Sequence, residues 1–302
     1  MKKVALALAS GGPRGFAYIG AIEELQSRGY EITSVSGTSA GALVGGIFAA
    51  GGMQAFKEWL YGLDPVKVMA LMDFSFSKNY LVKGDKVIKA IKERVPDIRI
   101  EDLPIPFTAV ATDLYTGEEV VFRDGPLFDA IRASISIPSM FRPVKWKGRT
   151  LVDGGMVNTF PLNRVQRTPG DILVGFNVNE IDAAEIQGFL DSRAALMESR
   201  DGLPLISRIQ TDLQAFRLDM DGRSERLPVK ADDNFASILQ RSFGIMNGTI
   251  ARMGIDACPP DVLASLPFDS YHGVYGYTHA PEIVERGRAL MAEALDQYEA
   301  AL

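Results

Sequence analysis

A serine stands where a short apolar segment meets the start of a helical pattern, in the pentapeptide Gly37-Thr38-Ser39-Ala40-Gly41. In this G-x-S-x-G spacing, a sharp strand-to-helix turn presents a serine hydroxyl clear of the sheet. Gly37 and Gly41 remove the side chains that would clash where strand and helix fold back on each other. The helix N-terminus also directs free N–H groups at a reacting carbonyl. The sequence therefore predicts Ser39 as a nucleophile, against the plainer hypothesis of a glycine-rich turn with a capping serine.

A glycine-rich loop over 10–15 follows the first apolar segment and opens the first helical one. A dinucleotide-binding loop would need glycine at position 10 and an acid at the end of the next strand, and Ser10 and Glu31 do not meet these conditions. The other hypothesis is an oxyanion hole made of backbone N–H groups, with a tight turn that does no chemistry as the plainer alternative. Pro13 has no N–H to offer. The candidate donors are Gly11, Gly12, Arg14, Gly15 and the amide of Ala40.

A serine nucleophile needs a proton acceptor, and the residues leave two kinds open. With His272 or His279 as the last member, the chain can supply the residue order Ser–Asp–His. Hydrolases of that order place several strands before the serine, whereas here only one strand precedes the strand that leads to Ser39. The other candidate is Asp153, whose carboxylate becomes a useful base if burial raises its pKa above the ordinary value of about 3.9. It is followed by Gly154 and Gly155, which let a backbone approach closely. An Asp-Gly-Gly run alone is more typical of a simple turn.

The elements expected around these residues suit an α/β fold with a mostly parallel sheet. The run over 4–9 is apolar throughout, which is typical of a strand buried on both faces. Because the C-terminal ends of parallel strands lie at one edge, the loops after the first two strands would face each other across a crevice. The expected strands are 4–9, 32–35, 107–112, 119–122, 144–146, 150–152 and 172–177. Helical apolar patterns cover 16–25, 43–48, 87–95, 126–133 and 281–302, with Gly29 and Asp85 as caps.

Composition excludes several classes of protein. The chain has 302 residues, 47% of them hydrophobic, and its charged fraction of 23% is close to that of a typical soluble protein, which excludes a disordered or low-complexity chain. With 32 basic and 38 acidic residues the net charge is −6, which argues against a nucleic-acid binder but leaves room for a local basic patch at a membrane surface. The one cysteine, Cys258, cannot form an internal disulfide and is interpreted as an ordinary half-buried residue, compatible with a reducing compartment.

Two segments imitate targeting or membrane signals. The start of the chain resembles a signal peptide, but its apolar stretch of six residues is shorter than such segments require. The uncharged run over 32–56 is long enough to span a bilayer, yet its six glycines fit a strand, a tight turn and a buried helix better. We therefore expect a cytoplasmic protein, with peripheral contact to a membrane as an open alternative.

Taken together, these segments resemble the bacterial branch of the patatin-like phospholipase family. The glycine loop with Arg14, the Ser39 pentapeptide and Asp153-Gly154-Gly155 are similar to the three signature blocks of that family, in order. Further similarity lies in 111–117, 133–138 and 141–143, so the resemblance runs from about residue 3 to 179. Two positions depart from the family pattern. Ser10 replaces the first glycine of the usual triple, and Tyr18 stands where many relatives carry histidine.

The resemblance implies a three-layer α/β/α fold with a mostly parallel central sheet, distinct from α/β-hydrolases. It implies a Ser39–Asp153 dyad that works without histidine, an oxyanion hole in the glycine loop, and hydrolysis of lipid acyl esters of the phospholipase A or lysophospholipase type. The substrate would be a lipid or phospholipid, and neither a cofactor nor a metal is expected. A lipid-binding regulatory module that kept the fold without the activity is the non-enzymatic alternative.

Some features of the chain remain less specific. We expect a single domain over 1–302, with a catalytic core over 1–180 and a mostly helical extension over 181–302. Apolar residues over 66–76 form either a lid or lipid-facing surface, or simply a packed helix and its connection, which is the commoner case. Nine charges between Arg217 and Asp233 are typical of a solvated connection. The sequence fixes neither the lipid head group nor the oligomeric state.

Overall fold

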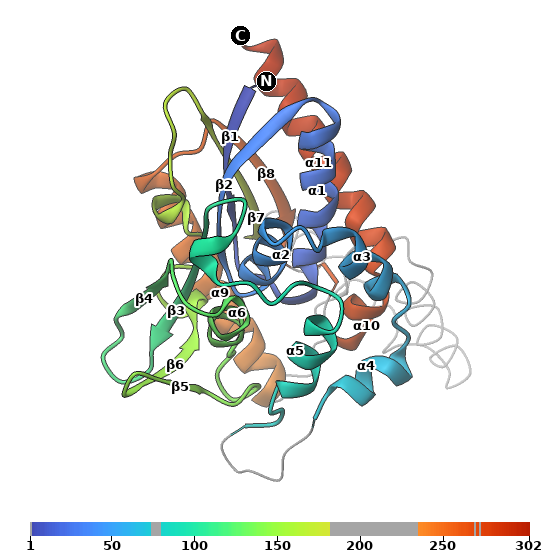
Figure 1. Ribbon diagram of the computed structural model, residues 1–302, viewed down its shortest axis with the longest axis vertical. Helices are drawn as coiled ribbons and strands as arrows, with labels where there is room; N and C mark the ends of the chain where they lie inside the picture. The colour runs from blue at the N-terminus through green and yellow to red at the C-terminus, as the bar shows by residue number, and fades with distance from the viewer. Residues whose placement is uncertain (1, 74–79, 182–234, 269, 272) are drawn as a thin grey trace, which may run out of the picture.

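A mixed, mostly parallel β-sheet forms the middle layer of the computed structural model, which describes residues 2–73, 80–181, 235–268, 270–271 and 273–302 (Figure 1). The strands are hydrogen-bonded to one another in the order β5-β6-β3-β2-β1-β7-β8, and β4 pairs with β3 outside this path. The strands are β1 (Lys2–Leu8), β2 (Tyr30–Thr38), β3 (Phe107–Asp113), β4 (Glu119–Phe122), β5 (Val144–Trp146), β6 (Arg149–Asp153), β7 (Ile172–Glu180) and β8 (Val262–Pro267). Strands β2, β1, β7 and β8 run parallel with β3, whereas β4, β5 and β6 make antiparallel pairs.

Helices cover both faces of the sheet, so the predicted three-layer α/β/α fold is confirmed. The larger core lies under α1, α2, α6 and α11, and the smaller one lies under α9 and the segment 160–165. The helices are α1 (Ala17–Ser27), α2 (Ala40–Ala49), α3 (Met53–Tyr61), α4 (Pro65–Leu71), α5 (Asp85–Lys92), α6 (Leu127–Ser134), α9 (Phe235–Ala257), α10 (Gly273–Thr278) and α11 (Ala280–Ala300). A short 3₁₀ helix, η1 (Gly12–Phe16), joins β1 to α1.

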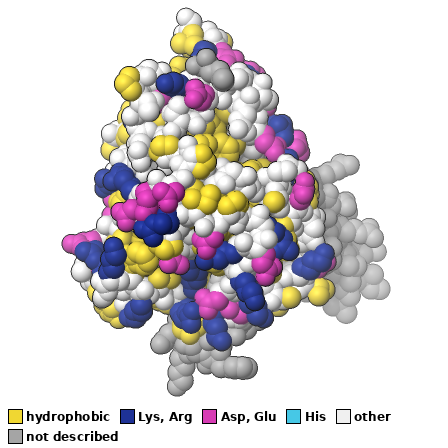
Figure 2. Space-filling view, in the orientation of Figure 1, with side chains coloured by type: hydrophobic (Ala, Val, Ile, Leu, Met, Phe, Trp, Pro, Cys, Tyr) yellow, Lys and Arg dark blue, Asp and Glu magenta, His cyan; other side chains and the backbone are white. Residues whose placement is uncertain are grey.

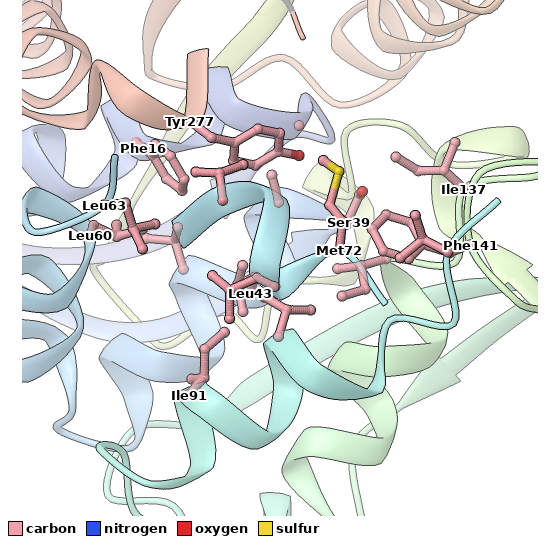
Figure 3. Close-up of a pocket in the computed structure, with 18 of the residues that line it drawn as sticks. Phe16, Ser39, Leu43, Leu60, Leu63, Met72, Ile91, Ile137, Phe141 and Tyr277 are labelled. Atoms are coloured by element: carbon pink, nitrogen blue, oxygen red, sulfur yellow. The ribbon is translucent and has the colours of Figure 1, made fainter. Parts of the chain in front are cut away.

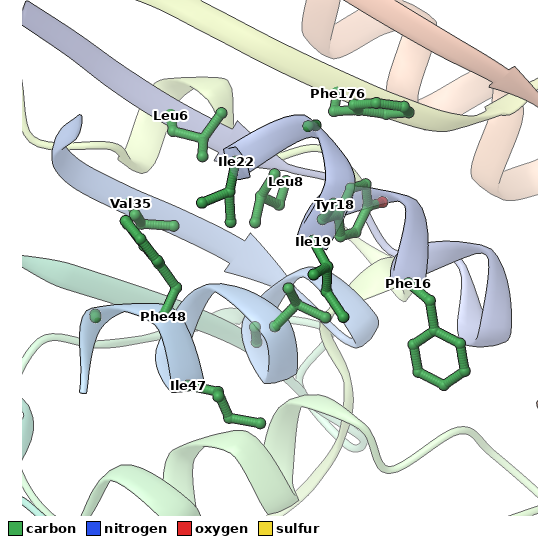
Figure 4. Packing of buried hydrophobic residues seen from close by; sticks show 14 of the residues in the cluster. Leu6, Leu8, Phe16, Tyr18, Ile19, Ile22, Val35, Ile47, Phe48 and Phe176 are labelled. Carbon is green, nitrogen blue, oxygen red and sulfur yellow. The ribbon is translucent and has the colours of Figure 1, made fainter. Parts of the chain in front are cut away.

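The central strand β1 shows how the sequence divides these two cores. Its side chains alternate between the faces of the sheet, as the two-residue period of a strand requires. The larger Val4, Leu6 and Leu8 enter the large core together with Tyr18 and Phe176 (Figure 4). The alanines between them, such as Ala5 and Ala7, enter the small core against α9. The expectation of a strand buried on both faces is therefore confirmed.

The C-terminal helix α11 packs along α1, although the two helices are far apart in sequence (Figure 1). Their backbones approach so closely at Gly20 that a Cβ there would lie 1.9 Å from the carbonyl oxygen of Val284. At the edge of the contact, the Arg28 guanidinium donates to Asp296 at 2.6 Å and to Glu299 at 3.3 Å. Residues beyond 181 are therefore part of the layer that covers the core, because α11 closes over α1.

Strand β8 extends the sheet beside β7, in a part of the chain for which the sequence predicted no strand. Asp85 was expected to cap its helix, but Gly84 occupies the cap position and Asp85 is the first helical residue, where it accepts from Arg142 at 2.7 Å. An acid in the first turn still suits the positive end of the helix dipole. The charged run from Arg217 to Asp233 lies outside the described residues.

The uncharged run over 32–56 forms the end of β2, all of α2 and the start of α3, as its glycines predict. Within the described part of the chain, no helix combines the length and the apolar character that a membrane crossing needs.

Gly20→Ala tests the packing of α1 against α11. The added methyl group has no room beside the Val284 carbonyl, so the helices must move apart. We expect the free energy of unfolding to fall by about 1–3 kcal/mol, measured by urea denaturation. Gly62→Ala is the control, because a Cβ there meets its nearest atom at an ordinary 3.5 Å. Equal stability of the two variants would contradict the close approach.

Candidate active site

The ends of two strands meet on one side of β3, and this meeting brings Ser39 and Asp153 together. Thr38 at the end of β2 pairs with Val110, and Asp153 at the end of β6 pairs with the next residue, Ala111. Strand β4 pairs with both Val110 and Ala111, so it occupies the opposite side of β3. Strands β2 and β6 therefore approach each other end to end, and the residue after Thr38 emerges beside Asp153.

Ser39 lies at a sharp turn from β2 into α2. Its backbone has φ 54° and ψ −118°, a combination that L-residues rarely adopt. The turn is this tight because Gly41 carries no side chain, and a Cβ there would lie 2.2 Å from the Leu8 carbonyl oxygen. A Cβ on Gly37 would likewise lie 2.3 Å from the backbone of Gly41. The glycines predicted to support the turn are thus the residues that let α2 start directly on the sheet.

Side chains from neighbouring segments hold the backbones of both residues in place. The N–H of Ser39 donates to Ser134 Oγ at 2.8 Å, and that hydroxyl donates in turn to the Val110 carbonyl at 2.6 Å. The N–H of Asp153 donates to the Ser136 carbonyl at 2.9 Å. These serines lie in the 133–138 block. A second block, 111–117, provides Thr112, whose hydroxyl donates to the Asp153 carbonyl at 2.9 Å. The strained turn therefore has buried hydrogen-bond support.

The Asp153 carboxyl is buried, with 6% of the residue exposed. Burial raises its pKa to about 6, while the neighbouring Ser39 hydroxyl and the N–H of Gly155 lower it. Gly155 N–H donates to Asp153 Oδ1 at 2.8 Å, whereas Oδ2 lacks a fully formed hydrogen bond within the described residues. The Ser39 hydroxyl is thus close enough to affect the carboxyl without being aligned as its donor, which is common before a substrate binds.

The glycine loop lies on the other side of Ser39. Gly12 has φ 56°, lines the same cavity as Ser39, and has open space where a Cβ would stand. The loop also touches the start of α2, because a Cβ on Gly15 would lie 2.5 Å from that of Ala40. No hydrogen bond recorded among the described residues uses the N–H of Gly11. Of the candidate donors, Gly12 therefore lies at the same cavity as Ser39, and Gly11 directly precedes it in the chain. On the Asp153 side, Gly154 packs against the Val110 carbonyl.

Arg14 holds the loop from behind. Its guanidinium donates to the Val178 carbonyl at 3.0 Å and to the Phe268 carbonyl at 2.9 Å, and it lies 4.6 Å from the centre of the Phe268 ring. Both of these hydrogen-bond acceptors are backbone carbonyls. Tyr18, at the family's histidine position, is buried and donates to the Ala9 carbonyl at 2.7 Å. Ser10 is also buried, and its hydroxyl has no partner in the described structure.

Ser39 opens onto an apolar cavity between α2, α3, α4 and α5 (Figure 3). The empty space is about 1000 Å³, part of it open to solvent. Figure 3 shows Ser39, Ile137 and Phe141 on one side of the cavity, with Leu60 and Leu63 on the opposite side. Its lining consists of Gly12, Phe16, Ser39, Ala40, Leu43, Val44, Phe56, Trp59, Leu60, Leu63, Val68, Leu71, Met72, Val82, Val87, Ile91, Ile135, Ile137, Met140, Phe141 and Tyr277. Such a lining accommodates a long apolar group next to the serine hydroxyl.

No motif or spacing in the sequence pointed to Tyr277, which comes from α10 in the part of the chain beyond the family blocks. Its ring packs edge-on against Phe16 at 5.9 Å, and burial raises the pKa of its hydroxyl. In the segment over 66–76, Val68, Leu71 and Met72 face the cavity, and residues 74–76 lie outside the described residues. This wall contains both a packed helix and apolar cavity surface, so the two hypotheses for the segment overlap.

The remaining candidates lie elsewhere. His279 precedes α11, where its Nδ1 lies 3.1 Å from Thr278 Oγ1, and it does not line the cavity. His272 lies outside the described residues. Cys258, half-buried as expected, packs against the small core. Among the described side chains, no group of three or more His, Cys, Asp or Glu is arranged to hold a metal ion.

Comparison with known proteins finds relatives that agree on the family. The model of the patatin-like phospholipase family matches residues 6–165. An uncharacterized NTE family protein of Mycobacterium tuberculosis is 32% identical over 333 residues, covering 98% of this chain and 92% of that protein. Patatin-like phospholipase domain-containing protein 6 of Mus musculus is 27% identical over 196 residues, covering 63% of this chain and 14% of the mouse protein. Among solved structures, VipD from Legionella pneumophila aligns with a TM-score of 0.47 at 16% identity, covering 98% of this chain and 67% of VipD.

Asp153→Asn tests the burial of the carboxyl through stability. The pKa of Asp153 is about 6 in the folded protein and about 3.9 in the unfolded chain. Between these pH values the carboxyl binds a proton more readily in the folded protein than in the unfolded chain. Its contribution to the free energy of unfolding therefore decreases as pH rises through this range. Asparagine does not titrate. The stability of the variant relative to the wild type should therefore increase by up to about 3 kcal/mol from pH 4 to pH 7.

Urea denaturation across this pH range measures the difference, with Asp256→Asn as the control because Asp256 is exposed on α9. If the stability of Asp153→Asn relative to the wild type changed as little with pH as that of the control variant, the carboxyl would not be held in an apolar site.

Proposed function

The chain belongs to the patatin-like phospholipase family, and from that premise we propose that it is a lipid acyl hydrolase with a Ser39–Asp153 dyad. The observation that carries the proposal is the end-to-end meeting of β2 and β6 along β3, which puts a strained serine beside a buried carboxyl. The reaction is cleavage of a carboxylic ester through an acyl-enzyme, of the phospholipase A or lysophospholipase type.

The first half of the reaction forms the acyl-enzyme. Ser39 Oγ attacks the ester carbonyl carbon while the ionised Asp153 carboxylate takes the hydroxyl proton. The tetrahedral intermediate then collapses, the bond between the carbonyl carbon and the alcohol oxygen breaks, and Asp153 returns the proton to the leaving alcohol. A carboxyl with a pKa near 6 suits both tasks near neutral pH, because it is ionised at rest yet more basic than an ordinary aspartate.

The second half releases the fatty acid. A water molecule attacks the acyl carbon and gives its proton to Asp153, which passes it to Ser39 Oγ as the ester bond breaks. In both halves the negative oxygen would lie against backbone N–H groups of Gly11, Gly12 or the start of α2. Such donors reduce the barrier because they are already oriented before the charge develops. The proposal assigns the Arg14 side chain to positioning this loop, because its guanidinium binds carbonyls behind it.

The cavity supports a long acyl chain as the group beside the serine. Aliphatic and aromatic side chains make up nearly all of its lining, and burying each CH₂ of a chain there is worth about 0.8 kcal/mol. The substrate would be a lipid or phospholipid met at a membrane surface, in a cytoplasmic setting. We propose that the acyl chain lies between α2, α3 and α4 and extends toward Leu60 and Leu63 (Figure 3).

The two alternative functions have less support. A Ser–His–Asp site would need a histidine at the Ser39 hydroxyl, and His279, the one histidine within the described residues, lies at the start of α11 outside the cavity lining. A lipid-binding module without activity would need neither the strained Ser39 backbone nor the buried carboxyl. Strain of about 1–3 kcal/mol is retained where the site uses it.

Ser39→Ala and Asp153→Asn should each abolish hydrolysis of a short acyl ester, with losses of at least about a thousandfold, because one removes the nucleophile and the other the base. His279→Ala, the control, should leave the rate within about twofold. Rates with a p-nitrophenyl ester measure this, and covalent labelling by a fluorophosphonate should require Ser39. Loss of activity in His279→Ala with retention in Asp153→Asn would favour the histidine alternative. A wild-type protein that is neither active nor labelled would favour the binding module.

Leu63→Trp tests the direction of the acyl chain. The larger ring fills the side of the cavity away from Ser39, so long chains should lose room while short chains keep theirs. We expect the ratio of kcat/KM for a long-chain to a short-chain p-nitrophenyl ester to fall by about tenfold or more. Leu263→Trp is the matched control, since Leu263 is partly exposed on β8 and does not line the cavity. An unchanged ratio in Leu63→Trp would place the chain elsewhere.

A further inference from the structure

The outer side of the cavity wall carries exposed apolar side chains. On α4, Val66 is 78% exposed and Met69 is 46% exposed, and Leu81 before α5 is 64% exposed. Neighbouring residues on the same elements, such as Val68 and Val82, face inward and line the cavity. The wall is thus apolar on both sides, which is unusual for a segment that only covers a core.

Hydrogen bonds join α4 to the start of α5, so the exposed residues belong to one continuous structure. The N–H of Lys83 donates to the Asp73 carbonyl at 3.1 Å, and the N–H of Gly84 donates to the Asp73 carboxylate at 2.8 Å. The ammonium of Lys86 on α5 reaches the carbonyl of Ala70 on α4 at 3.5 Å. We call this structure the rim and define its exposed members as Val66, Met69, Leu81, Lys83, Lys86 and Lys89.

The rim carries three positively charged lysines. Lys83, Lys86 and Lys89 are exposed, and no ion pair recorded for the described residues involves them. The acids close by have other partners: Asp85 pairs with Arg142, and the Asp73 carboxylate accepts from a backbone N–H. Figure 2 shows Lys and Arg side chains interspersed with Asp and Glu on the lower part of this face, where Figure 1 places α4 and α5. The segment 83–89 itself carries three lysines and one acid, so it is positively charged in a chain whose net charge is −6.

We propose that the rim docks onto a bilayer that contains anionic phospholipids. The apolar side chains enter the interface, and each lysine near an anionic surface adds about 1 kcal/mol of attraction. A bilayer fits better than an acidic protein because the rim borders a cavity suited to an acyl chain. Moving a lipid chain of about sixteen carbons through water would cost on the order of 10 kcal/mol, and docking the cavity wall onto the bilayer shortens the path through water. The role of the rim in lipid hydrolysis rests on the proposed function, whereas the binding of the rim to vesicles does not depend on it.

The test measures binding without catalysis. Ser39→Ala protein is sedimented with phosphatidylcholine vesicles, either pure or containing phosphatidylglycerol, at low and high salt. We expect binding to the anionic vesicles that weakens at high salt. Adding Lys83→Glu, Lys86→Glu and Lys89→Glu should weaken this binding by about tenfold or more, and Leu81→Ser should weaken it further.

The control carries Lys3→Glu, Lys145→Glu and Lys147→Glu, which change the net charge equally at exposed positions outside the rim. It should bind anionic vesicles much more tightly than the rim variant, with both variants folded by circular dichroism. Equal losses in the two variants, or no binding of Ser39→Ala protein to anionic vesicles, would overturn the proposal, and the latter result would point to an acidic protein partner. Vesicle binding by a wild type that hydrolyses no ester would leave the docking intact and remove the proposed function.

Discussion

The pairing of β3 with two strands on one side is the constraint on which the site depends. Strand β2 pairs with the first half of β3 and β6 with the second half, from the opposite direction. A shift of one residue in the register of β6 would turn Asp153 to the other face of the sheet, and the same shift in β2 would displace the turn that carries Ser39. The registers are fixed where the strand ends meet by the buried hydroxyls of Thr112 and Ser134 and by the carbonyl of Ser136. The relation between two residues 114 positions apart is thus set by backbone pairing.

The two sides of the site have different surroundings. Apolar side chains line the cavity onto which Ser39 opens, and they leave room for a hydrocarbon chain. The Asp153 carboxyl is not part of that lining, and its own burial raises its pKa to about 6. One of its oxygens accepts a hydrogen bond from Gly155, whereas the other lacks a partner within the described residues. This burial matters for the proposed dyad, because an ordinary aspartate is too weakly basic to compete for a serine proton.

Local chemistry in the sequence predicted much of this arrangement. Glycines at fixed offsets from Ser39 and Asp153 mark tight turns, and such turns depend on few residues, so their positions could be predicted. The chemical roles of the two residues stay predictions. Strand β8 was missed because a short apolar run near Pro259 and Pro260 has too few residues to distinguish strand from loop. Tyr277 and the partners of Arg14 could not be found, since they depend on α10 and on segments that only the tertiary fold brings near. Cavity-lining residues have the same apolar pattern as core residues.

Because Arg14 is anchored by segments that come late in the sequence, the order of synthesis determines when the glycine loop can become fixed. Its guanidinium binds carbonyls that lie 164 and 254 residues later in the sequence. During synthesis, Ser39 and Asp153 leave the ribosome well before Phe268, so the glycine loop lacks this anchor while both are already present. Contacts of such long range also form slowly, because a large loop must close first. The completed loop is therefore a late product of folding, and a nascent chain cut short before Phe268 would carry the signature segments with the glycine loop only partly anchored.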